Sequence, residues 1–178
     1  MKDKPLIVYY SWSETVAQIA GEVQRQVGGD ILRLYPETPY PDDYQECVEQ
    51  AKKEVPGKFT PKLKPFDLDL GKYDSIFVGS PNWCGSFAPP TRTFLTSFDL
   101  TGKVIYPFCS HGGGGQRNFT ADVLSVCAKA MVKDTLVLAG TGGRNLTQII
   151  RQWIQETGKP KNTPHRSANS CDLCPGFG

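Results

Sequence analysis

Residues 6–29 read LIVYY-SWSET-VAQIAGEVQRQV-GG. The first five are a continuous apolar run, which is what a strand needs when both faces of its sheet are covered. A short polar segment follows, and apolar residues then recur every three or four positions until two glycines, which predicts an amphipathic helix and its end. That apolar stripe consists of Val16, Ile19, Ala20, Val23 and Val27. The stretch therefore predicts one strand–loop–helix unit of an α/β domain.

Further short apolar runs predict more strands of the same parallel sheet. They lie at 75–79, 104–108 and 135–139, and a more alternating run at 31–35 carries Arg33, as an edge strand can. Helical patterns at 87–98, 119–130 and 146–154 separate these strands. Strand and helix in alternation give right-handed crossovers, so we expect a three-layer, doubly wound α/β fold with a parallel five-stranded sheet.

The chain of 178 residues is one domain's length, and we assign that domain to residues 1–158. Residues 36–73 are rich in proline and hold a short polar helix candidate at 42–54. This segment has too few apolar residues for a core of its own, so we expect a surface excursion. Residues 159–178 are rich in Pro, Asn, Ser and Gly, and we expect a loosely ordered tail there.

The composition excludes several classes of partner. A net charge of +2 is too small to indicate binding to nucleic acid or to a membrane surface. The apolar run near the N-terminus is too short for a signal peptide or a membrane span. Scattered cysteines are typical of buried thiols in a reducing compartment. We therefore expect a cytoplasmic protein; its oligomeric state does not follow from the sequence.

Ligands of open parallel sheets bind at the carboxyl ends of the strands, where three unusual loops are expected. The hydroxyl groups and helix N-terminus of the first loop indicate a phosphate site. Alternatively, Ser11 and Glu14 form a capping box in which the helix satisfies its own end. The candidate residues of this loop are Ser11, Trp12, Ser13, Glu14, Thr15 and Val16.

The second loop places an aromatic ring at the exit of the strand at 75–79. That ring can lie against a planar ligand or pack on the sheet edge. A cysteine beside it can act as a thiol nucleophile, but the sequence positions no general base to activate it. The candidate residues are Pro81, Asn82, Trp83, Cys84 and Gly85.

The third loop contains four consecutive glycines, which cost chain entropy and indicate close backbone approach to a ligand or positive φ angles. A merely flexible loop is the alternative. The histidine before the glycines can polarise a ligand, cap the loop or face solvent. The candidate residues are Ser110, His111, Gly112, Gly113 and Gly115.

Taken in order, these loops resemble the flavodoxin-like family, and within it an FMN-binding branch with S-W-S, P-x-W-x-G and F-C-x-H-G-G-x-G loops. Residues 39–44 (PYPDDY) and 51–54 (AKKE) also resemble segments of that branch. The resemblance covers residues 5–157 and implies the strand order 2-1-3-4-5.

The resemblance also implies non-covalent FMN. Ser11, Ser13 and Thr15 would hold its phosphate, Trp83 and Gly85 would lie along the isoalloxazine, and residues 110–115 would contact the pyrimidine edge. The protein would then be an electron carrier or a small flavin-dependent reductase, working with a redox partner protein or a small-molecule electron acceptor.

This chain departs from the family pattern at the phosphate loop. The family usually has Gly-Asn-Thr after the second serine, whereas this chain has Glu14, Thr15 and Val16. An acidic group near the phosphate and a lost hydroxyl predict weaker FMN binding. They support a second hypothesis, a binding or regulatory module on the same scaffold with weakened or lost FMN binding. Cys84 also replaces the usual aromatic residue beside Trp83.

Two further features bear on function. Electron-carrier flavodoxins are typically acidic, and their negative electrostatic field helps them dock on basic partners. This chain has a pI near 8.2 and therefore lacks that field. Cys171 and Cys174 form one C-x-x-C pair, which supports a third hypothesis, a thiol-based reductase. A second pair is missing from the sequence, so a four-cysteine metal site within one chain is not expected.

Overall fold

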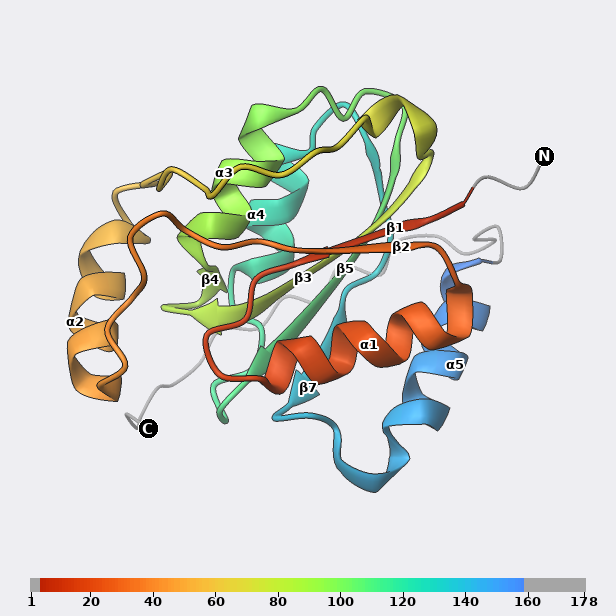
Figure 1. Ribbon diagram of the computed structural model, residues 1–178. Helices are drawn as coiled ribbons and strands as arrows, with labels where there is room; N and C mark the ends of the chain where they lie inside the picture. The colour runs from red at the N-terminus through yellow and green to blue at the C-terminus, as the bar shows by residue number, and fades with distance from the viewer. Residues whose placement is uncertain (1–3, 159–178) are drawn as a thin grey trace.

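The computed structural model describes residues 4–158 and shows one twisted sheet between two layers of helices (Figure 1). The parallel strands lie in the order β2-β1-β3-β5, and β6 and β7 share the position beyond β5. This confirms the predicted flavodoxin-like order 2-1-3-4-5. The strands are β1 (Leu6–Tyr9), β2 (Asp30–Arg33), β3 (Ser75–Trp83), β5 (Val104–His111), β6 (Met131–Val132) and β7 (Leu136–Ala139).

The fifth strand position is divided in two, which the sequence did not predict. Val104 pairs with Met131 in β6, and Phe108 pairs with Leu136 in β7. The N–H of Lys133 still donates to the carbonyl of Ile105 at 2.8 Å, and residues 134 and 135 then lie outside the paired strands. A strand of two residues is too short to produce a recognisable apolar pattern, so the sequence did not predict β6.

A second unpredicted strand, β4 (Ser86–Phe87), pairs antiparallel with the end of β3. The two residues of the turn, Cys84 and Gly85, both have positive φ, 52° and 82°. This is the backbone that a two-residue hairpin loop requires, and Gly85 adopts it without steric cost. The predicted second loop is therefore a β-hairpin that carries β3 beyond the edge of the parallel sheet.

Helices cover both faces of the sheet (Figure 1). One face packs on α1 (Thr15–Val27) and α5 (Leu146–Thr157), and the other on α3 (Pro89–Ser97) and α4 (Phe119–Val126). Helix α4 ends before the predicted stripe does, because the chain turns at residues 127–129, where the N–H of Ala130 donates to the carbonyl of Cys127 at 2.9 Å. Two 3₁₀ turns, Leu70–Lys72 and Gly143–Asn145, complete the connections.

Successive residues of the central strands point into different cores, which explains their continuous apolar runs. In β1, Ile7 packs with Val16 and Trp153 on the α1 and α5 side, whereas Val8 packs with Phe94 on the α3 side. Both strand residues are completely buried. The two cores fix the register of the sheet and hence the places where its loops leave.

The excursion at 36–73 packs on the core of the α3 side through Tyr40, Cys47 and Leu70, all of which are buried. Its helix α2 (Tyr44–Glu54) is capped by the carboxylate of Asp43 and lies beyond the end of the sheet where β3 and β4 meet (Figure 1). The predicted tail, with Cys171 and Cys174, lies outside the described residues. Within residues 4–158, no helix has the length and apolarity to cross a membrane.

Candidate functional site

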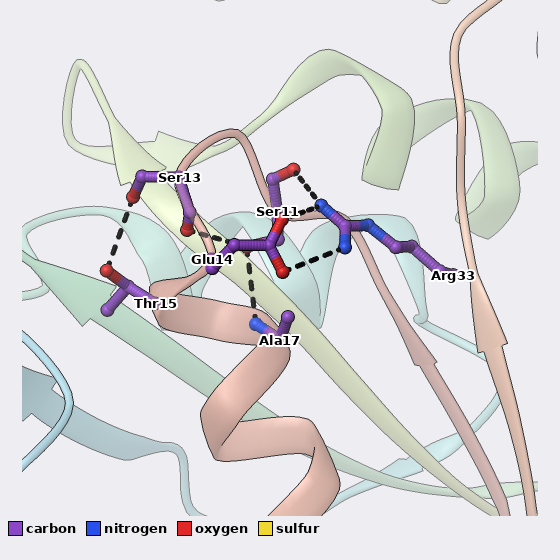
Figure 2. A network of polar contacts seen from close by, with 6 residues as sticks. All are labelled: Ser11, Ser13, Glu14, Thr15, Ala17 and Arg33. Atoms are coloured by element: carbon purple, nitrogen blue, oxygen red, sulfur yellow. Dashed lines mark hydrogen bonds and ion pairs between the residues drawn. The ribbon is translucent and has the colours of Figure 1, made fainter.

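The first loop is folded around its own hydroxyl groups (Figure 2). The buried Ser11 donates from Oγ to the carbonyl of Ser13 at 3.0 Å and accepts the N–H of Ala17 at 3.2 Å. The hydroxyls of Ser13 and Thr15 lie 3.2 Å apart. The capping-box alternative is wrong, because α1 begins at Thr15 and the side chain of Glu14 makes no capping hydrogen bond.

The carboxylate of Glu14 is held by Arg33 of β2. Its two oxygens accept hydrogen bonds from the guanidinium at 2.8 and 3.1 Å, and Arg33 also donates to the carbonyl of Ser11 at 3.2 Å. These hydrogen bonds and the charge of Arg33 lower the pKa of Glu14 from its usual value. In Figure 2 the carboxylate points to the opposite side from the hydroxyls of Ser13 and Thr15. The negative charge expected at the phosphate position is therefore neutralised and turned away.

The remaining residues of this loop have structural positions. The side chain of Val16 packs in the core, so a threonine there would place its side chain in the core as well. Trp12 donates its indole N–H to the carbonyl of Pro41 at 3.0 Å and lies against the ring of Tyr44, which ties the excursion to the loop. Among the described residues, none accepts from the backbone N–H groups of Ser13, Glu14 or Val16. These donors at a helix N-terminus suit an anion.

In the second loop, the ring of Trp83 is half-buried and fixed by two aromatic neighbours. It meets Tyr40 at a centroid distance of 4.9 Å and Tyr10 at 5.6 Å, both nearly perpendicular. Edge-to-face geometry is favourable for such pairs. Tyr40 is in turn anchored by a 2.6 Å hydrogen bond from its hydroxyl to Glu54 of α2. Trp83 is therefore a rigid wall at the end of β3.

The second and third loops are joined by Asn82. Its Nδ2 donates to the carbonyls of Gly115 and Gln116, both at 2.9 Å, and its Oδ1 accepts from the N–H of Gly85 at 3.0 Å. The carbonyl of Gly85 also accepts from Asn118 at 2.8 Å. Pro81 continues β3 beside Ser110 of β5. The structure thus brings these two predicted loops together as one unit.

The third loop begins directly after β5. His111 caps it by accepting the N–H of Gly113 on Nδ1 at 3.0 Å, and Ser110 donates to the carbonyl of Gly140 at 2.7 Å. Gly113 and Gly115 have φ angles of 134° and 70°, which side-chain-bearing residues rarely adopt. A Cβ built on Gly112, Gly113 or Gly115 would meet no atom within 4 Å. The glycines thus expose backbone to open space, where a planar ligand can approach.

Cys84 does not have the properties of a thiolate nucleophile. It is exposed, and partial burial raises the pKa of its thiol more than Lys52 nearby lowers it. In a Cys171→Ser, Cys174→Ser variant, we expect a thiol reagent to label one cysteine rapidly in the native state. This cysteine is Cys84, and its labelling rate should climb as pH approaches 9. Burial raises the pKa values of the other thiols to between about 11 and about 12, so they should react only after unfolding. Rapid labelling of Cys84 at pH 6 would contradict this and indicate an activated thiol.

Sequence reasoning missed two residues that shape the site. Arg33 was assigned only to an edge strand, and Tyr40 only to the excursion. The parallel pairing of Tyr9 with Arg33 is what places the guanidinium beside the first loop. A cation in an otherwise apolar strand was the available signal. In the part of the chain that is described, no group of three His, Cys, Asp or Glu side chains could hold a metal ion.

Comparison with known proteins identifies the family of this chain. The sequence profile of the flavodoxin family matches residues 4–157. A crystal structure of a candidate flavoprotein from Bacteroides eggerthii DSM 20697 is similar, with 26% identity, a TM-score of 0.77, and coverage of 88% of this chain and 99% of that one. The crystal structure of a flavoprotein in complex with FMN from Lactobacillus acidophilus NCFM shares the fold, with 20% identity, a TM-score of 0.70, and coverage of 85% and 98%. The order of strands and the match over nearly the whole described domain show that this chain is a member of the flavodoxin family.

Proposed function

We propose that this chain binds FMN and acts as a redox protein of the branch with S-W-S, P-x-W-x-G and F-C-x-H-G-G-x-G loops. The observation that carries the proposal is the pairing of Glu14 with Arg33, since it removes the charge that argued most strongly against a phosphate. It also weakens the alternative, a regulatory module without flavin, which was based on that charge.

The residues of the site fit the cofactor. The hydroxyls of Ser13 and Thr15 and the backbone N–H groups at the start of α1 would hold the phosphate. Trp83 would pack on the ring, and the exposed backbone of residues 112–115 would lie at its edge. FMN there would supply electron transfer, while the chain supplies binding, orientation and a tuned environment.

Within this function, the chain would act in the cytoplasm as an electron carrier or a small flavin-dependent reductase. Its acceptor would be a redox partner protein or a small molecule. A pI near 8.2 provides no acidic field for a basic partner and favours the reductase. The four described cysteines are free thiols, in keeping with a reducing compartment.

Titration of the apoprotein with FMN tests the proposal through quenching of flavin fluorescence. We expect saturable binding, and a Ser13→Ala, Thr15→Ala variant should bind FMN about a hundred- to ten-thousandfold more weakly, because each of the two hydroxyls bonded to an anion contributes about 1.5–3 kcal/mol. Riboflavin has no phosphate, so its affinity should change little. Thr96→Ala, which removes an exposed hydroxyl on α3, is the matched control.

Two outcomes would overturn the proposal. One is a colourless protein that takes up no FMN at high micromolar concentration. The other is an equal loss of riboflavin and FMN affinity in the double variant, since this would place the effect outside the phosphate contacts.

A further inference from the structure

A hollow of about 340 Å³ lies on the β2 side of the first loop. Its walls include the rings of Tyr10, Trp12, Tyr35 and Tyr40. Ser11 and Ser13 of the first loop line it as well, whereas none of the residues of the second and third loops does. This volume is at the lower end of the range for small-molecule sites, which are mostly aromatic or apolar with a few polar groups. The hollow therefore adjoins the phosphate end of the proposed flavin site and does not include the residues proposed to hold the flavin ring.

The walls of this hollow are fixed by hydrogen bonds of the chain itself. Trp12 and Tyr40 are anchored on Pro41 and Glu54, as described above. The segment that follows β2 is tied to the rest of the excursion, where the N–H of Lys64 donates to the carbonyl of Tyr35 at 2.7 Å beside the bridge between Pro36 and Leu63. A site held in this way needs little ordering when a ligand binds.

The charges on the lining select the ligand. The ammonium of Lys64 has no carboxylate partner within ion-pair distance in residues 4–158, and it lies 5.9 Å from the centre of the half-exposed Tyr35 ring. The guanidinium of Arg33 lies on the same ring at 5.3 Å but is engaged with Glu14. The Lys64 ammonium is thus available next to an exposed aromatic surface, and the Asp42 carboxylate on the lining disfavours a dianion such as phosphate.

We propose that this hollow is a second binding site, which takes an aromatic carboxylate bearing a hydroxyl or amino group. The ring would stack among the aromatic walls, the carboxylate would pair with Lys64, and the hydroxyl or amino group would donate to Asp42. Tyr10 and Tyr40 line the hollow and also contact Trp83, so one aromatic cluster lies between the hollow and Trp83, while Ser13 borders both the hollow and the proposed phosphate site. The site stands on its own lining and does not require FMN.

The probe that tests this site is 4-hydroxybenzoate, added to the full chain without FMN and followed by the indole N–H signal of Trp12 in ¹⁵N–¹H spectra. We expect a saturable shift of this signal below about 10 mM, the range for a ligand of this size. Lys64→Gln should weaken binding by roughly tenfold or more, because it removes a charge-assisted hydrogen bond. Lys62→Gln is the matched control, since Lys62 is an exposed neighbour that pairs with Glu37 at 3.2 Å.

Four outcomes would overturn the proposal: no saturable shift with 4-hydroxybenzoate, equal binding of benzylamine, equal affinity of the two lysine variants, or loss of 4-hydroxybenzoate binding when FMN saturates the protein. The last would show that the hollow belongs to the cofactor site. Because the titration is made without FMN, failure to bind FMN leaves this result intact, and the two proposals fail separately.

Discussion

We expect Arg33→Gln to weaken the proposed FMN binding by about ten- to a hundredfold and to leave riboflavin binding nearly unchanged. The substitution removes both guanidinium donors from Glu14. The carboxylate is solvent-exposed, so without Arg33 it is free to turn toward the hydroxyls of Ser13 and Thr15 and to repel a phosphate there. Fluorescence titrations with FMN and riboflavin measure the effect, and added salt should reduce it because the charges are exposed.

A double-mutant cycle identifies the cause. If Arg33 acts by restraining Glu14, the Arg33→Gln, Glu14→Gln variant recovers most of the FMN affinity, and Glu14→Gln alone binds at least as well as the unaltered chain. Arg25→Gln is the matched control, because Arg25 is a second arginine near this layer that pairs with Glu22 and also donates to Thr147, away from the first loop. A double variant as weak as Arg33→Gln would contradict the restraint. The loss would then come from the hydrogen bond of Arg33 to the Ser11 carbonyl.

Much of the fold follows from the sequence because the central strands are covered on both faces. Ile7 and Val8 must both be apolar because each lies in a different core. The same condition allows the strands at 75–79 and 104–108 to be predicted from their continuous apolar runs. The carboxyl ends of such strands meet at one edge, so the order of the strands along the chain is enough to predict that the three candidate loops lie together. The glycines of the third loop could also be interpreted from the sequence alone, because a positive φ angle excludes most other residues.

The parts that were missed depend on contacts between distant segments. Whether Glu14 faces a phosphate or Arg33 is decided by the pairing of β1 with β2, and no local pattern contains that choice. Tyr40 lies in a polar, proline-rich stretch and becomes a buried neighbour of Trp83 only because α2 and the excursion fold over the sheet end. The division of the fifth strand position into β6 and β7 likewise depends on pairing with β5.

We expect Gly79→Ala to lower the free energy of unfolding by about 3 kcal/mol, because the interior of the sheet has no room for a methyl group at this position. Gly79 pairs with Phe108 on the neighbouring strand, and a Cβ there would lie 2.2 Å from both Cε2 and Cζ of the Phe108 ring. That ring is fully buried and packs edge-on against Trp153 at 6.4 Å, so it cannot move aside cheaply. Urea unfolding followed by circular dichroism measures the loss, and the thermal midpoint should fall by roughly 6–12 °C.

Gly21→Ala is the opposite case on the same scaffold. Gly21 lies in α1, where a Cβ would meet no atom within 4 Å, and alanine has the higher helix propensity, so this change should stabilise the protein by about 0.5–1 kcal/mol.

A clash at Gly79 also predicts partial rescue by a second substitution. Phe108→Leu in the Gly79→Ala background removes the ring atoms that the new methyl group meets. The double variant should therefore lose less stability than the two single variants added together. Strictly additive losses would mean that the methyl group is accommodated without touching Phe108. The destabilisation would then have to come from the backbone of β3 itself.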